Sequence, residues 1–185
     1  MSAGLVLIGP PGAGKTTVGR ALAAASGLPF ADTDQMVEDS AGMGASDIFL
    51  AEGEAGFRAR ERVAALRALG GADGGVVALG SGAVLDAEVA ALIDPARTVF
   101  LDVGAGEGLA RKGLAGPRPV LPVAPRAAWT ALMERRRPVY LRLAATAIPT
   151  DGLEPGQIAL RVGRLMRDWS HSGPGEWPGD GPGGA

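Results

Sequence analysis

The sequence predicts an α/β fold built around a parallel β-sheet, because short apolar runs alternate along the chain with stretches of helical periodicity. The first run, Leu5–Ile8, is continuously apolar and meets the Gly/Pro-rich residues 9–12, which is typical of a buried parallel strand that ends in a tight loop. A chain of 185 residues suits one domain. We expect that domain to span residues 1–171, and we expect residues 172–185, which are rich in Gly and Pro, to form a disordered tail.

The remaining elements follow in regular alternation. A helix is expected over 15–26 with Gly27 as its C-cap, and a second strand over 28–31. Helical patterns resume at Gln35 and over 46–69, where Ser46 has the character of an N-cap. Further strands are expected over 76–79, 98–101 and 145–148, and further helices over 87–93, 106–112, 127–143 and 155–169.

The composition excludes several kinds of chemistry. The chain has no Cys and a single His, so it lacks the residues for disulfides, thiolate nucleophiles, Cys-based zinc sites and Ser-His-Asp triads. With 18 basic and 20 acidic residues its net charge is −2, which gives no overall attraction for nucleic acid. No apolar run approaches the roughly 18 residues of a membrane span, and the N-terminus lacks the features of a signal peptide. We therefore expect a soluble, cytoplasmic protein that binds neither nucleic acid nor membrane.

Residues 9–16 match the P-loop pattern G-x-x-x-x-G-K-[ST] in full. The pattern lies between the first expected strand and the first expected helix, where glycines let backbone N–H groups converge on phosphate oxygens and the helix N-terminus adds partial positive charge. Lys15 would reach the β- and γ-phosphates, and the hydroxyl of Thr16 would ligate Mg²⁺. The candidate ATP contacts are Gly12, Ala13, Gly14, Lys15, Thr16 and Thr17, of which Thr17 also suits a plain helix position.

Five further motifs follow the P-loop, and with it they carry a family resemblance. They are Asp32-x-Asp34, Phe57-Arg58-x-x-Glu61, Gly80-Ser81-Gly82, Arg118-Pro119-Val120-Leu121 and Arg136-x-Pro138-x-Tyr140. In their order and spacing the chain resembles the shikimate kinase family from end to end except for the C-terminal tail. The resemblance implies a P-loop NTPase fold, a three-layer sandwich whose five-stranded parallel sheet has the order 2-3-1-4-5, with a mobile lid at about 113–125. It also implies transfer of the γ-phosphoryl group of ATP, with Mg²⁺, to the 3-hydroxyl of shikimate.

The two aspartates of the second motif follow the second expected strand. Alternation with a period of two would direct Asp32 and Asp34 to one side, near the carboxyl ends of the strands, where ligands bind in such sheets. By resemblance Asp32 helps Thr16 to hold Mg²⁺, while Asp34 accepts hydrogen bonds from shikimate hydroxyls and takes the proton of the attacking one. The alternative for either residue is that it only caps the next helix.

Two arginines suit the carboxylate of such an acceptor. The resemblance assigns Arg58 and Arg136 to this role, and their planar guanidinium groups can bind a carboxylate through two hydrogen bonds each. Glu61 lies three residues after Arg58 on one helix face, so it can orient that guanidinium. The alternative is a solvated helix surface, which we favour for the neighbouring Arg60, Arg62, Arg135 and Arg137.

The remaining candidates surround these two groups. Gly80 and Gly82 would let backbone N–H groups approach the acceptor, or would form a plain turn; Ser81 between them departs from the three glycines that are usual in the family. Arg111 resembles the arginine that stacks on adenine, and Arg118 in the lid would reach the transferring phosphoryl group. Residues 151–155 would form the far wall of the adenine pocket.

Two other functions remain open at this stage. One is a related small-molecule kinase that acts on gluconate or a nucleoside monophosphate, since paired arginines also suit a phosphate-bearing acceptor. The other is a nucleotide-binding regulator without catalysis. We expect the protein to be a monomer in either case.

Overall fold

The computed structural model describes residues 4–71, 74–111 and 125–172. The expected lid, apart from Pro125, and the expected tail, apart from Ser172, lie outside these residues, and so does Arg118. Within the described residues no helix is both long enough and apolar enough to cross a bilayer.

Five parallel strands form one sheet in the order β2-β3-β1-β4-β5, which confirms the predicted fold class and strand order. The register aligns Leu7 of β1 with Ala78 of β3, and Ala78 in turn with Asp32 of β2. The strands are β1 (Leu5–Ile8), β2 (Phe30–Asp32), β3 (Val76–Ala78), β4 (Thr98–Asp102) and β5 (Thr146–Pro149).

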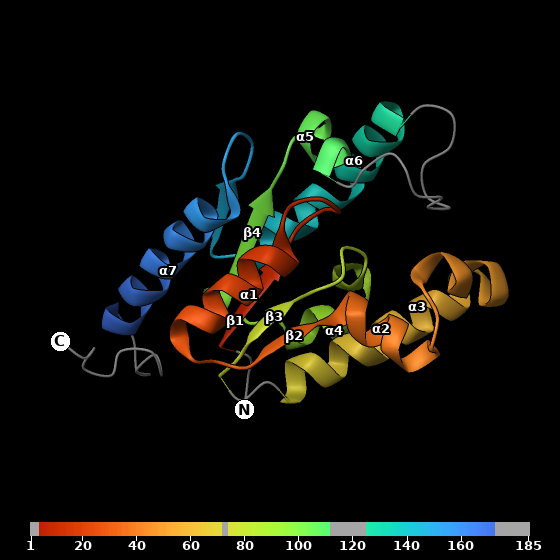
Figure 1. Cartoon of the computed structure of the whole chain (residues 1–185), viewed down its shortest axis with the longest axis horizontal. Coiled ribbons are helices and arrows are strands. Elements are labelled where there is room, and N and C mark those ends of the chain that lie inside the picture. The colour runs from red at the N-terminus through yellow and green to blue at the C-terminus, as the bar shows by residue number, and fades with distance from the viewer. Residues whose placement is uncertain (1–3, 72–73, 112–124, 173–185) are drawn as a thin grey trace.

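Helices cover both faces of the sheet, and Figure 1 shows α7 at one side of the molecule and α2 with α3 at the other. The helices are α1 (Lys15–Ser26), α2 (Thr33–Ala41), α3 (Ala45–Gly71), α4 (Ala87–Leu92), α5 (Ala105–Arg111), α6 (Pro125–Leu143) and α7 (Pro155–Ser172), with single 3₁₀ turns η1 (Ala83–Leu85) and η2 (Pro95–Arg97).

Successive residues of β1 enter two different cores. Leu5 and Leu7 pack with α1 and α7, whereas Val6 and Ile8 pack with α3, α4 and α6. All four side chains are buried. A strand that is buried on both faces needs a continuous apolar run, which is why β1 shows no polar alternation.

Most elements begin or end one or two residues away from the predicted positions, and three helix ends illustrate the differences. Helix α3 begins at Ala45, so Ser46 is not its N-cap; the side chain of Glu38 in α2 accepts a hydrogen bond from the Ala45 N–H at 3.0 Å instead. Helix α2 begins at Thr33 rather than near Gln35, because Asp32 caps it. Helix α7 continues to Ser172, past the expected end at Trp169.

Phe100 of β4 is fully buried in the hydrophobic core and stacks on Tyr140 of α6 at 5.0 Å between ring centroids. Phe100→Ala should lower the free energy of unfolding by about 3–5 kcal/mol, because it removes this contact and leaves a cavity. Chemical denaturation measures the change. Leu160→Ala on the exposed side of α7 is the matched control and should change stability by less than about 0.5 kcal/mol; equal effects would place the core elsewhere.

Candidate active site

The P-loop joins β1 to α1 and leaves backbone donors available at the start of the helix. Gly14 is the N-cap of α1 at φ 91°, and no side chain among the described residues caps it. Gly12 has φ 81°, and a Cβ on it would collide with the carbonyl of Gly108 in α5, so only glycine fits this position. Lys15 is buried, and its Nζ donates to the carbonyls of Gly9 at 2.8 Å and Pro10 at 3.0 Å. The loop therefore forms a concave, positively polarised site for an anion.

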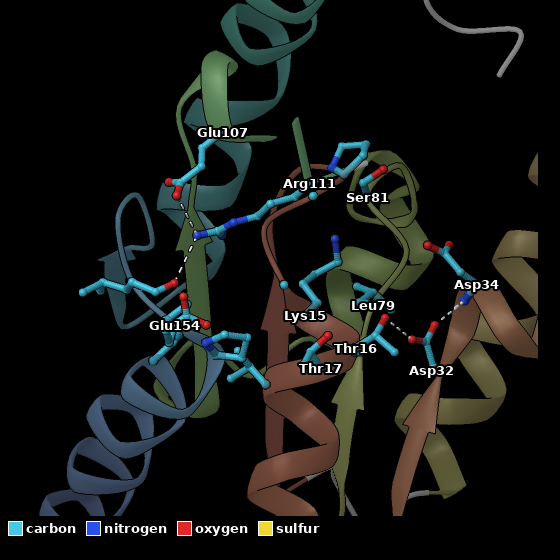
Figure 2. A pocket seen from close by; sticks show the side chains of 18 of the residues that line it. Lys15, Thr16, Thr17, Asp32, Asp34, Leu79, Ser81, Glu107, Arg111 and Glu154 are labelled. Carbon is cyan, nitrogen blue, oxygen red and sulfur yellow. Dashed lines mark hydrogen bonds and ion pairs between the residues drawn. The ribbon is translucent and has the colours of Figure 1, made fainter. Parts of the chain in front are cut away.

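Asp32 caps α2, as one of the two alternatives predicted, and its side chain also contacts the P-loop. One carboxylate oxygen caps α2 by accepting the N–H groups of Asp34 at 3.0 Å and Gln35 at 3.3 Å. The other oxygen accepts the Thr16 hydroxyl at 2.5 Å, so it faces the P-loop (Figure 2). Asp34 lies on the first turn of α2 and not on a strand, so strand alternation was the wrong reason for placing it beside Asp32.

Asp34, Arg58 and Glu61 meet at the turn that follows β3. A Cβ on Gly80 would lie 2.9 Å from Oδ1 of Asp34 and 2.8 Å from Oε1 of Glu61, so these carboxylates come close to the backbone there. Glu61 is buried and accepts from Nη1 of Arg58 at 2.5 Å. A Cβ on Gly82 would collide with that guanidinium. The two glycines therefore provide the space in which the charged groups gather.

Arg136 approaches the same turn from α6. It is buried, and its Nη1 donates to both the carbonyl oxygen and the hydroxyl oxygen of Ser81, each at 3.2 Å. Ser81, whose role was left open because the family usually has glycine there, thus supplies an oxygen that glycine lacks. Arg58 and Arg136 approach one pocket from two helices.

Arg111 is anchored at the other end of the site. Its Nη2 donates to the carbonyls of Thr150 at 2.7 Å and Leu153 at 3.2 Å. Glu107, one turn earlier, pairs with Arg111 at 3.3 Å and accepts the N–H of Gly152 at 2.8 Å. Glu107 was not among the predicted site residues, although its spacing of four residues from Arg111 is the signal of a helical ion pair.

Two pockets result from this arrangement. The first, of about 750 Å³, is lined by the P-loop, Asp32, Asp34, Arg111 and the loop after β5, and Figure 2 shows Lys15 between Arg111 and Asp34. The second, of about 800 Å³, is lined by Phe49, Glu54, Arg58, Leu85, Ala128, Ala131, Leu132, Arg135 and Arg136. Ser81 lines the first pocket and holds Arg136 of the second, so the pockets lie on either side of one turn.

Comparison with known proteins agrees with this geometry. A family model described as shikimate kinase matches residues 11–167. This chain belongs to the shikimate kinase family. A curated shikimate kinase of Salinispora arenicola is 47% identical over 161 residues, which cover 87% of this chain and 96% of the relative. Another, of Saccharopolyspora erythraea, is 46% identical over 163 residues, or 88% of this chain and 93% of that one.

A solved member of the shikimate kinase family has the same architecture. The structure of shikimate kinase from Acinetobacter baumannii in complex with shikimate superposes with a TM-score of 0.82 at 34% identity, over 89% of this chain and 92% of that one.

The arginines next to the site residues lie at the helix surface, as predicted: three are exposed and Arg60 is partly exposed. Three of the four are also ion-paired, and the fourth lines the rim of the second pocket. The pairs are Arg60 with Glu52, Arg62 with Glu88 and Arg137 with Asp102, while Arg135 is the pocket residue.

Tyr140 is a further residue whose place the sequence did not reveal. It is fully buried, and its hydroxyl donates to the Ser81 carbonyl at 2.7 Å. Burial raises the pKa of Tyr140 to about 12, against the opposing effect of the nearby Arg136 cation. The hydroxyl therefore stays protonated and supports the turn that holds Arg136.

Tyr140 is the chain's single tyrosine, so its titration can be observed directly by ultraviolet absorbance of the phenolate. We expect a midpoint near pH 12 in the folded protein and near 10 in denaturant. Because the folded pKa is the higher one, the stability that this group contributes is complete below pH 10 and is lost as pH rises towards 12. Tyr140→Phe should abolish that part of the alkaline loss; a folded midpoint near 10 would contradict the burial argument.

Proposed function

We propose that this chain is a shikimate kinase, which transfers the γ-phosphoryl group of ATP to the 3-hydroxyl of shikimate and yields shikimate 3-phosphate and ADP. The observation that carries the proposal is the pair of pockets on either side of the Ser81 turn, one built for phosphate and the other containing two arginines. The curated relatives named shikimate kinase, and the neighbour solved in complex with shikimate, support it.

ATP is the donor, and the first pocket suits its triphosphate. N–H groups of Gly12, Ala13 and Gly14 would surround the phosphates, and Lys15 would exchange its loop carbonyls for the β- and γ-oxygens. Arg111 lies beside the loop of residues 151–155, where its planar face would stack on adenine. Thr17, the third residue of α1, lines the same pocket.

The second pocket suits the acceptor. Arg58 and Arg136 would bind the carboxylate of shikimate, because two fixed guanidinium groups orient a ring better than one. Asp34 lines the ATP pocket and lies against Gly80, so it would accept hydrogen bonds from the ring hydroxyls and take the proton of the attacking one. Backbone groups of Gly80 and Gly82 would contact the ring.

Thr16 and Asp32 fit a magnesium site. Among the described residues no group of three or more acidic or histidine side chains gathers to hold a metal, but Mg²⁺ usually takes one or two protein oxygens and completes its shell with phosphates and water. The adjacent oxygens of Thr16 and Asp32 match that donor set. Bound Mg²⁺ would offset the negative charge of the phosphates during transfer.

Three further parts of the proposal concern the whole chain. Arg118, in a lid at residues 113–125, would bring positive charge to the transferring phosphoryl group when the lid closes over both substrates. The enzyme would act as a monomer with one kinase domain, predicted over residues 1–171 and extended by one residue to the end of α7, and a disordered tail after Ser172. It would work in the cytoplasm, where ATP is available.

An acceptor panel tests the proposal against the alternatives. Release of ADP should require shikimate, while gluconate and nucleoside monophosphates should give no turnover above the rate without acceptor. Turnover with gluconate or a nucleoside monophosphate alone would assign a different kinase. ATP binding without consumption under any of these conditions would favour a regulator.

The two arginines should act on the acceptor and not on ATP. Arg58→Ala and Arg136→Ala should each raise the shikimate KM by roughly tenfold or more, since each removes a charge-assisted hydrogen bond of about 1.5–3 kcal/mol. Steady-state kinetics with each substrate varied separately measures this. Arg137→Ala is the control on the same helix, because Arg137 pairs with Asp102 outside the pocket. Equal losses for both substrates would indicate damage to the fold.

Asp34 should matter more for the rate than for affinity. Asp34→Asn keeps the size and hydrogen bonding of the side chain but removes the charge that takes the proton, so kcat should fall by roughly 10²- to 10⁴-fold while the shikimate dissociation constant changes little. Single-turnover kinetics and titration calorimetry separate the two. A loss of binding at an unchanged maximal rate would make Asp34 an orienting group only.

A further inference from the structure

Helix α3 contains a sharp kink beside the acceptor pocket. Gly53 has φ 71° and ψ −177°, a conformation in which side chains other than glycine are strained, and it divides the helix into a short limb, residues 45–52, and a long limb, residues 54–71. A Cβ on Gly53 would meet nothing within 4 Å. The requirement for glycine therefore comes from the backbone conformation and not from crowding.

A bidentate ion pair joins the two limbs across the kink. Nε and Nη2 of Arg60 donate to the two carboxylate oxygens of Glu52, both at 2.8 Å. Residues eight apart on a straight helix are separated by about 12 Å along the axis, so this contact exists only because the helix is kinked. Gly56 makes room for the returning limb, since a Cβ there would lie 2.5 Å from Cβ of Glu52. The hydrogen bonds with Arg60 lower the pKa of the Glu52 carboxyl.

The kink brings an aromatic side chain of the short limb to the acceptor pocket. Phe49 stacks on Phe57 of the long limb at 4.3 Å between ring centroids, and Phe49 lines the pocket together with Arg58. The Arg58 guanidinium lies 5.6 Å from the Phe57 ring centroid. One wall of the acceptor pocket is therefore formed by the short limb.

We propose that Glu52 and Arg60 are a positioning pair for the acceptor: by holding the short limb against the long one, they fix the Phe49 wall and so set the fit of the ring that Arg58 and Arg136 bind. Neither lines either of the two pockets. The inference rests on the proposed function for the identity of the acceptor. The pairing of Glu52 with Arg60 itself rests on the geometry of α3.

Breaking the pair should weaken acceptor binding selectively. We expect Glu52→Gln and Arg60→Gln each to raise the shikimate KM roughly three- to fivefold, the upper part of the range for loss of one well-oriented surface pair, with kcat and the ATP KM within about twofold of wild type. The charge-swapped double variant E52R/R60E should recover most of the loss. Glu88→Gln is the matched control, because it breaks the Arg62–Glu88 pair that joins the same helix to α4.

A second variant pair tests the kink itself. Gly53→Ala should raise the shikimate KM at least as much as Glu52→Gln, because it strains the conformation that folds the limb back. Gly70→Ala, at an open position of the same helix, should leave both KM values unchanged. If Glu52→Gln and Gly53→Ala behave like their controls, or if both substrates are affected equally, the positioning role is overturned.

Amide hydrogen exchange separates failure of this inference from failure of the proposed function. Residues 45–52 should exchange faster in Glu52→Gln than in wild type and Glu88→Gln, without any substrate present. If the wild-type chain fails to phosphorylate shikimate, the proposed function fails, and the exchange rates still decide whether the pair holds the limb. Unchanged exchange at residues 45–52 would show that the Glu52–Arg60 pair does not hold the short limb, and the inference would be overturned.

Discussion

Parallel strand pairing brings together groups that are far apart in the sequence. Because β1, β2 and β3 run in one direction and in register, three groups emerge at one edge of the sheet. They are the P-loop after Ile8, the aspartate at the end of β2 and the turn after Ala78. Helices α3 and α6 then bring Arg58 and Arg136 to that edge. If the register of β3 against β1 shifted by one residue, its side chains would exchange faces and Gly80 would no longer face Asp34.

Hydrogen bonds within the protein hold the cations of the site in place. Lys15 donates to loop carbonyls, Arg111 to the carbonyl of Thr150, and Arg136 to Ser81. Such contacts reduce the freedom that each side chain loses on binding, and they keep positive charge directed towards the pockets. Arg58 differs, because its partner is the carboxylate of Glu61, which offsets part of its charge. A substrate carboxylate must therefore either displace Glu61 from Arg58 or share the guanidinium with it.

The sequence predicted the sheet because its signals are local. Leu5–Ile8 is apolar throughout and β4 is almost so, and the P-loop pattern fixes both the end of β1 and the start of α1. The family resemblance supplied the strand order, which no local pattern contains. The predicted helix boundaries were wrong where tertiary contacts decide them. At Ala45, for example, the N–H is capped by Glu38 from another helix.

The parts of the site that were missed depend on distant contacts. Arg60 was interpreted as helix surface, and Glu52 was not singled out at all. Their spacing of eight residues suits no straight helix, and only the conformation of Gly53 brings them together. Ser81 was recognisable as a departure, but its partners Arg136 and Tyr140 come from a helix more than fifty residues later. Sequence periodicity carries no information about such contacts.

The most direct test of the account is a crystal structure of the chain with ADP and shikimate bound together. The account predicts that the shikimate carboxylate lies within hydrogen-bonding distance of Arg58 and Arg136, with the 3-hydroxyl beside Asp34 and directed towards the P-loop. A ring bound with its carboxylate towards Lys15, or bound outside the pocket between Phe49 and Arg136, would contradict the division of the site into a phosphate side and an acceptor side.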